Sequence, residues 1–181
     1  MPKAASDFSF IHSQESDVNT SSPTLQTADR VPVDHAEIVD ALYRFGAGQD
    51  LRDRELFDSS FSVDATLDFT GPARRLGTTL PVLRGRQAIG DAIFETIATL
   101  DTTHTITNPR VTAYDGQHAT LFALVEAQHL PRHDHGRHLL LKNIYTVALS
   151  RHGDRWMIDR MHIENVWVTG DPSVLFAVVR A

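Results

Sequence analysis

The stretch DTTHTITN, residues 101–108, places one histidine among four threonines in a segment whose β-branched residues predict an extended strand. Side chains alternate along a strand, so His104 shares a face with Ile106 and Asn108, opposite Thr103, Thr105 and Thr107. An imidazole has an ordinary pKa near neutral pH, which suits it to abstract a proton. His104 is therefore a candidate general base. A core histidine bonded to a backbone carbonyl is the alternative.

A catalytic histidine needs an acceptor that fixes its tautomer and stabilises the imidazolium. Asp50 is the candidate, because it ends the amphipathic run DHAEIVDALYRFGAGQD, residues 34–50. A carboxylate at a helix C-terminus faces the negative end of the helix dipole, which is unfavourable unless it caps the next element or meets a cation. Capping of the following helix is therefore the alternative role for Asp50, and Asp53 competes for it.

The hydrophobic pattern indicates which elements would position these residues. Apolar residues at three- and four-residue spacing predict a helix from Asp34, where Asp34 and Glu37 resemble a capping box, and further helices over DRELFDSSF and GRQAIGDAIFETIATL. A strand over DATLDFTGP and a loop over ARRLGTTLPVLRG are expected between the last two helices. Four more strands are expected at about 103–114, 118–130, 138–150 and 155–168.

The order of these elements predicts an α+β fold, because helices and one strand precede four consecutive strands with short turns between them. Such a meander is antiparallel, and helices that cover one face of a curved sheet would enclose a pocket. Residues 1–30 are rich in Ser, Thr, Asp, Gln and Pro, a composition that predicts a flexible N-terminal arm. The folded domain is therefore expected over residues 31–181.

Composition argues against several classes of function. The net charge of −6 and the scattered arginines argue against a nucleic-acid partner. No apolar run approaches the roughly 18 residues that a membrane span needs. The chain has no cysteine, which excludes disulfides, thiolate nucleophiles and cysteine-based metal sites. Since the first residues show no apolar leader pattern, a cytoplasmic location is expected.

The run HLPRHDHGRH gathers four histidines, with a spacing that could bind a transition metal on a strand: His129, His133, His135 and His138. Pro131, Gly136 and the charged residues favour a solvated hairpin loop, so no metal site is predicted. The glycine spacings of nucleophile elbows and nucleotide loops are missing from the sequence. Covalent and nucleotide chemistry therefore have no support, and no cofactor is expected.

From about Asp34 to Leu175 the chain resembles the SnoaL-like group of the nuclear transport factor 2-like superfamily, which includes polyketide cyclases, scytalone dehydratase and hexachlorocyclohexane dehydrochlorinase. The resemblance rests on the order and spacing of several stretches: the helix ending in QD at Asp50, LRGRQAIGDAIF, HTITNPRV, IYTVALSRHGDRWMIDR and VWVTGDPSVL. It implies a cone-shaped, curved antiparallel sheet with three helices around a pocket, and a homodimer or homotrimer.

In relatives with dehydratase-type chemistry, an aspartate after the first helix and a histidine on the sheet form a proton-abstracting dyad, and Asp50 and His104 fall on those positions. The resemblance therefore implies a cofactor-independent lyase or isomerase, of dehydratase or cyclase type, acting on a small hydrophobic cyclic molecule. A non-catalytic ligand-binding or assembly domain is a second possibility. An epoxide-type hydrolase is a third, and it would need a second acidic residue at the pocket, for which Asp68 is the candidate.

Several other side chains are candidates for contact with the substrate. Some relatives carry a Tyr or Lys five residues before the aspartate, where this sequence has Phe45. The Tyr145 phenol could donate to an oxyanion or pack in the core. Lys142 and Asn143 precede it and face opposite sides, so only one can reach the pocket. Trp167 could close the pocket mouth or contact a neighbouring subunit. The predicted substrate contacts are Phe45, Asn108, His129, Tyr145 and Trp167.

Overall fold

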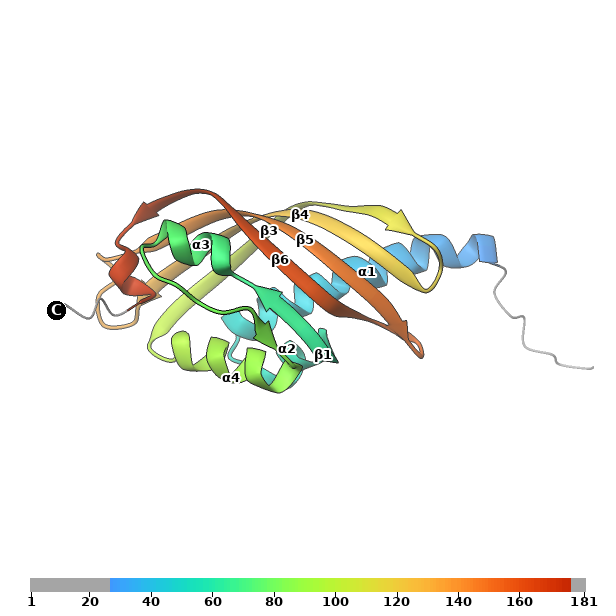
Figure 1. Ribbon diagram of the computed structural model, residues 1–181, viewed down its shortest axis with the longest axis horizontal. Helices are drawn as coiled ribbons and strands as arrows, with labels where there is room; N and C mark the ends of the chain where they lie inside the picture. The colour runs from blue at the N-terminus through green and yellow to red at the C-terminus, as the bar shows by residue number, and fades with distance from the viewer. Residues whose placement is uncertain (1–26, 177–181) are drawn as a thin grey trace, which may run out of the picture.

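The computed structural model describes residues 27–176. Figure 1 shows a long curved sheet with helices against it. The elements follow one another as α1 (Thr27–Asp50), α2 (Arg54–Asp58), β1 (Phe61–Asp68), α3 (Thr70–Arg75), β2 (Leu83–Arg84), α4 (Arg86–Thr96), β3 (Leu100–Tyr114), β4 (His118–Pro131), β5 (Leu139–His152), β6 (Arg155–Gly170) and the 3₁₀ helix η1 (Pro172–Val174). The predicted α+β class is confirmed.

The sheet has six strands in the order β2-β1-β6-β5-β4-β3. Strands β3 to β6 pair antiparallel with their sequence neighbours, as the turn signals predict. Strand β1 instead pairs parallel with β6, so the sheet is mixed rather than wholly antiparallel. Strand β2 contributes a two-residue antiparallel pairing to the free edge of β1.

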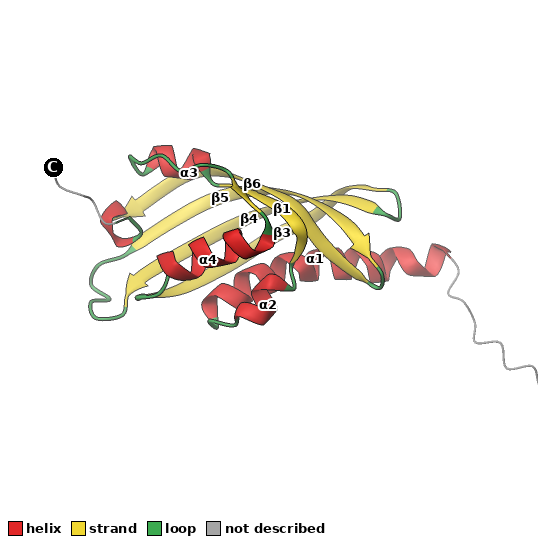
Figure 2. Cartoon of the chain, turned by 60° about the horizontal axis from the view of Figure 1, so that its bottom comes forward, coloured by secondary structure: helices red, strands yellow, loops and turns green. Residues whose placement is uncertain are grey.

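Helices α1, α2 and α4 lie on one side of the sheet (Figure 2). The described residues hold one α-helix more than the three expected, because α3 forms where the end of a strand and the start of a loop were predicted. The Gly71-Pro72 pair is typical of a strand end, yet proline is also favoured in the first turn of a helix, where its missing N–H removes no hydrogen bond. Among the described helices, none has the length and hydropathy of a membrane span.

Helix α1 begins at Thr27, earlier than the predicted start at Asp34. Residues 27–30 therefore belong to α1 rather than to the predicted arm, whose residues 1–26 lie outside the described residues. Asp34 is not an N-cap but a buried residue in the helix, where it accepts a hydrogen bond from the Tyr114 hydroxyl and pairs with Arg151. The Arg151 guanidinium in turn lies 4.9 Å from the centre of the Trp156 ring. We call Asp34, Tyr114, Arg151 and Trp156 the Asp34 cluster.

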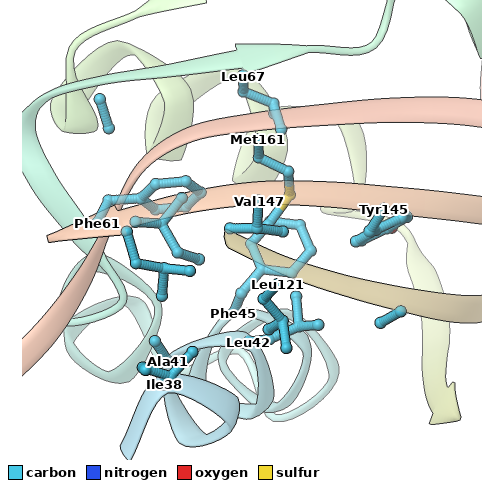
Figure 3. Packing of buried hydrophobic residues seen from close by; sticks show 14 of the residues in the cluster. Ile38, Ala41, Leu42, Phe45, Phe61, Leu67, Leu121, Tyr145, Val147 and Met161 are labelled. Atoms are coloured by element: carbon cyan, nitrogen blue, oxygen red, sulfur yellow. The ribbon is translucent and has the colours of Figure 1, made fainter. Parts of the chain in front are cut away.

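The main core forms where α1 packs against the inner face of the sheet (Figure 3). Ile38, Ala41, Leu42 and Phe45 recur at three- and four-residue spacing and face the sheet together, as the helical pattern predicts. They meet side chains from alternate positions of the strands, which therefore share one face: Leu121, Val147 and Met161.

Two glycines let the last turns of α1 approach its neighbours closely. A Cβ at Gly48 would lie 2.6 Å from the backbone nitrogen of Phe57, closer than any side chain allows. A Cβ at Gly46 would lie 3.2 Å from the His104 Cβ. The sequence FGAGQD therefore places the end of α1 directly against β3 at His104.

Candidate active site

Asp50, the last residue of α1, holds His104 of β3 through two hydrogen bonds. The His104 Nδ1 lies 2.8 Å from Asp50 Oδ1, and the His104 backbone N–H donates to Asp50 Oδ2 at 2.7 Å. The His104 side chain is only 5% exposed and the Asp50 side chain 20%. The two residues are 54 positions apart in the chain, and the close approach of α1 to β3 brings them together.

The Asp50 carboxylate is ionised and therefore sets the tautomer of His104. Burial raises the pKa of Asp50, but the hydrogen bonds and charge of His104, together with the Thr102 hydroxyl, outweigh burial and leave the pKa below its ordinary value. An ionised carboxylate only accepts hydrogen bonds, so His104 Nδ1 carries a proton. The other ring nitrogen, Nε2, is then the atom that can accept a proton.

Thr102 binds the Asp50 carboxylate directly, and Arg52 holds the backbone around it. The Thr102 hydroxyl donates to Asp50 Oδ1 at 2.9 Å. Arg52 adopts a left-handed backbone conformation with φ of 60° and bonds the carbonyl oxygens of Gln49 and Leu100, which ties the end of α1 to the start of β3. Its guanidinium also lies 3.3 Å from the Thr102 hydroxyl oxygen. Arg52 and Thr102 are positioning residues for the aspartate.

Replacing Thr102 by valine is expected to lower the rate of any reaction that uses His104 as base by about threefold to tenfold, since one neutral hydrogen bond to Asp50 is lost. The same loss raises the pKa of Asp50, because the hydroxyl stabilises its ionised form. Carboxylate ¹³C NMR titration measures that change directly. Thr102→Ser keeps the hydroxyl and is the matched control, so equal effects of the two substitutions would contradict the assignment.

The ring of His104 forms part of the wall of a cavity of about 150 Å³ between the sheet, α4 and the segment before β2. A cavity of this size holds a molecule of about one six-membered ring. Its lining is mostly apolar, and within residues 27–176 it includes no Asp, Glu, Lys or Arg side chain. The polar residues of the lining are Gln49, Thr96, His104, His129, Asn143 and Tyr145.

Two buried polar groups in this lining have no hydrogen-bond partner among the described residues. They are Nδ1 of His129 and Nδ2 of Asn143. Burial, together with the charge of nearby His104, lowers the pKa of His129 to about 4, so His129 is neutral at pH 7. Burial also raises the pKa of the Tyr145 phenol, and the charge of Asp50 adds to that effect while the Asn143 side chain opposes it. The cavity therefore presents neutral hydrogen-bonding groups beside one histidine–carboxylate pair.

Comparison with known proteins identifies the family. The family described as the SnoaL-like domain matches residues 33–162. The chain belongs to the SnoaL-like family. The SnoaL-like chain is also 32% identical over 150 residues to the "Terrestric acid biosynthesis cluster protein E" of Penicillium crustosum, across 78% of this chain and 88% of that protein.

Solved structures show the same fold for this SnoaL-like domain. A candidate scytalone dehydratase from Novosphingobium aromaticivorans aligns with a TM-score of 0.68 and 17% identity, over 86% of this chain and 99% of that one. The hexachlorocyclohexane dehydrochlorinase LinA-type3 from Novosphingobium barchaimii aligns with a TM-score of 0.65 and 17% identity, over 77% and 90%. The curved sheet with helices on one side is thus the nuclear transport factor 2-like fold.

Phe45, His129 and Tyr145 line the cavity of the SnoaL-like domain, whereas Asn108 and Trp167 do not. Asn108 is exposed, because a register shift between Thr107 and Arg110 interrupts the alternation of β3, and Asn108 itself has a φ of 53°. Trp167 is 40% exposed and pairs in register with Lys142, whose neighbour Asn143 faces the cavity. The cavity lining therefore does not include two of the predicted substrate contacts, Asn108 and Trp167.

The structure also shows what two other acidic residues, Asp53 and Asp68, contact. Asp53, rather than Asp50, caps α2, because its side chain accepts the backbone N–H of Leu56 at 2.9 Å. Asp68 bonds Thr70 and His162 and lies outside the apolar cavity. The second acidic residue that a hydrolase would need at the cavity is therefore not supplied by Asp68.

The histidine-rich run of the SnoaL-like domain divides between a strand and a loop. His129 is buried on β4, while three others are exposed in the predicted hairpin loop: His133, His135 and His138. Within the described part of the chain, no three His, Asp or Glu side chains are grouped as metal ligands.

The residues of the site that were not among the predicted contacts include Gln49, Arg52, Thr102 and Asn143. Alternation along β5 predicts Asn143 as a cavity residue once the buried face of that strand is known. The position of Gln49 next to Asp50 in the sequence is the signal that could have predicted it as a residue of the site. Nothing in the sequence points to Arg52, whose role depends on its left-handed backbone.

Proposed function

We propose that this protein is a cofactor-independent lyase or isomerase, of dehydratase or cyclase type, that abstracts a proton beside a carbonyl group of a small, neutral cyclic molecule. The observation that carries the proposal is the 2.8 Å contact between Asp50 and a buried His104 in the wall of an apolar cavity. A positioned base of this kind contributes about 10²–10⁴-fold to a proton transfer.

In the proposed reaction the unprotonated Nε2 of His104 takes a proton from the carbon next to the carbonyl. The electron pair of the broken C–H bond forms a carbon–carbon double bond, and the π pair of the carbonyl moves to its oxygen to give an enolate. Asp50 stabilises the imidazolium. We assign the stabilisation of the enolate oxygen to Nδ2 of Asn143 and the hydroxyl of Tyr145, because both residues line the cavity and can donate. From this enolate the imidazolium can give its proton to a departing hydroxyl, which leaves as water, or return it at another carbon. Ring closure instead has the enolate carbon attack a second carbonyl of the same molecule, whose oxygen then takes the proton.

The relatives support an elimination or cyclisation more than a hydrolysis. The names scytalone dehydratase and hexachlorocyclohexane dehydrochlorinase both describe eliminations, although at low identity to this chain. The terrestric acid cluster protein, at 32% identity, belongs by its name to a biosynthetic cluster and supports a cyclase-type step. Its similarity covers most of both proteins.

Hydrogen–deuterium exchange of cyclohexanone in D₂O, followed by NMR, tests the proposed function. We expect the protein to accelerate exchange at the two carbons beside the carbonyl, since the cavity holds a molecule of this size. Binding of cyclohexanone without accelerated exchange would instead identify a ligand-binding domain. Acceleration that persists after the cavity is filled by the substitution Ala127→Phe would also contradict the proposal.

We further propose that the protein forms a homodimer or homotrimer through the sheet face opposite the cavity. That face carries half-buried apolar residues, among them Phe122, Leu124 and Ile144. Sedimentation analysis is expected to give two or three times the mass of one chain. Leu124→Glu should produce single chains because it places a charge on this face, while Gln117→Glu adds the same charge at an exposed turn and should not. A single-chain mass for the unchanged protein would rule the proposal out.

A further inference from the structure

The pairing of β5 with β6 is irregular at Asn143, a residue of the cavity lining. Asn143 pairs with Asn165, whereas the preceding residue Lys142 pairs with Trp167, so β6 contains one extra residue, Val166, at this point. A bulge of this kind redirects a side chain at the point where it occurs. Here Asn165 is part-buried and reaches the side chain of Asn143.

The contacts of Asn165 fix the orientation of its amide. Its Nδ2 lies 3.2 Å from the Lys142 carbonyl oxygen and 3.0 Å from the Trp167 carbonyl oxygen. Both partners only accept hydrogen bonds, so the atom that faces them must be the nitrogen. The reversed amide would bring Oδ1 against two carbonyl oxygens and lose both bonds. Asn165 is therefore a hydrogen-bond donor on this side.

The orientation of Asn165 determines that of Asn143. The third neighbour of Asn165 Nδ2 is Asn143 Oδ1, at 3.0 Å, and this contact is favourable only if Asn143 presents its oxygen. The other end of the Asn143 amide, Nδ2, is then fixed away from Asn165. Asn143 is fully buried, lines the cavity, and has no partner for Nδ2 within residues 27–176.

We infer that Asn165 is a positioning residue that holds Asn143 as a hydrogen-bond donor, so that the cavity selects molecules with an acceptor oxygen, such as a ketone or ester carbonyl, at this point. A molecule that places a group able only to donate there, such as an ammonium, leaves two donors face to face. Tyr145 cannot make this distinction, because a hydroxyl rotates to donate or accept. The inference deepens the proposed function, on which it rests for the role of the bound molecule.

The other end of the Asn165 amide carries a cost. Its Oδ1 is buried and has no hydrogen-bond partner among the described residues. A buried acceptor without a partner is unfavourable, and an apolar residue of similar shape would avoid this cost. The contacts of Nδ2 offset this cost: they are the two backbone carbonyl oxygens at the bulge and Oδ1 of Asn143.

Ligand binding to the full-length protein tests the inference with two probes of similar size, cyclohexanone as acceptor and toluene as a molecule with no hydrogen-bonding group. We expect the unchanged protein to bind cyclohexanone about threefold to tenfold more tightly than toluene, the effect of one hydrogen bond. In Asn165→Ala the ratio of the two dissociation constants should fall to within about twofold, because Asn143 is free to turn. Val166→Ala, which changes the exposed neighbour in the bulge, should keep the original ratio.

A general loss of packing would weaken both probes together and leave the ratio unchanged, so the ratio separates positioning from structure. A second measurement needs no variant: the ¹H–¹⁵N NMR signals of the Asn143 side-chain NH₂ should shift with cyclohexanone and not with toluene. No preference in the unchanged protein, or the same preference in Asn165→Ala, would overturn the inference. Failure of proton exchange with the preference intact would refute only the proposed function.

Discussion

Replacing His104 by glutamine is expected to lower the rate of α-proton exchange on bound cyclohexanone by about 10²–10⁴-fold. Glutamine is similar in length to histidine but cannot accept a proton at neutral pH. The dissociation constant of cyclohexanone should change by less than about threefold, because the acceptor oxygen is held elsewhere in the cavity. NMR exchange rates and binding titrations on the same samples measure the two effects. A variant that kept more than half of the rate would contradict the assignment of His104 as base.

Asp50→Asn belongs to the same experiment and tests the other half of the pair. An amide does not stabilise an imidazolium and allows His104 to present the wrong nitrogen, so a loss on the order of 10²–10⁴-fold is expected here too. The matched control is Asp53→Asn, three residues further along, where the side chain caps α2 and does not contact His104. Because asparagine also caps helices well, this control should retain both stability and rate.

Asp34→Ala is expected to lower the free energy of unfolding by about 3–5 kcal/mol, the largest stability effect that we predict. The Asp34 side chain is 5% exposed and pairs with Arg151, which is 11% exposed, so the substitution leaves a mostly buried guanidinium without its carboxylate. The matched control is Asp40→Ala on the same helix. Asp40 pairs with Arg44 but is 54% exposed, and its loss should change stability by less than about 1 kcal/mol. Urea unfolding measures both values.

The contribution of Asp34 to stability should also depend on pH. Burial raises the pKa of Asp34, but the hydrogen bonds from Arg151 and Tyr114 and the charge of Arg151 outweigh it, so the folded-state pKa lies below the ordinary value of 3.8. A lowered pKa means that the stabilisation is present above 3.8 and is lost as the pH falls through the folded-state value. The difference between the unchanged protein and Asp34→Ala should therefore shrink in acid. An equal difference at about pH 3 and pH 7 would contradict this role.

The four-strand meander could be predicted because its turns are marked locally. Gly116 and Gly153 both adopt a positive φ at the predicted turns, a conformation that glycine adopts easily. The parallel pairing of β1 with β6 could not be predicted, because strand order depends on contacts between distant segments. The partners of Asp34 could not be predicted for the same reason. Its neighbours Glu37 and Ile38 suggest a helix start, while its partners Tyr114 and Arg151 come from β3 and β5.

Within the site, Asp50 and His104 could be predicted from residue type, strand alternation and family resemblance together. The alternation argument holds for His104 and fails at Asn108, because the sequence does not show the register shift after Thr107. Alternation also shows that only one of Lys142 and Asn143 can reach the cavity, but not which of them. That choice depends on which face of β5 the helices cover.

Helix α1 carries Asp34, its contribution to the Asp34 cluster, in its first half and Asp50 at its end, sixteen residues or roughly 24 Å apart along the axis. No member of the Asp34 cluster belongs to the cavity lining. Mutations that remodel the cavity for a new molecule therefore leave intact the ion pair that anchors the helix. Such a separation permits a lineage to accumulate changes of specificity without first acquiring compensatory stabilising mutations, and it gives the fold a structural basis for evolvability.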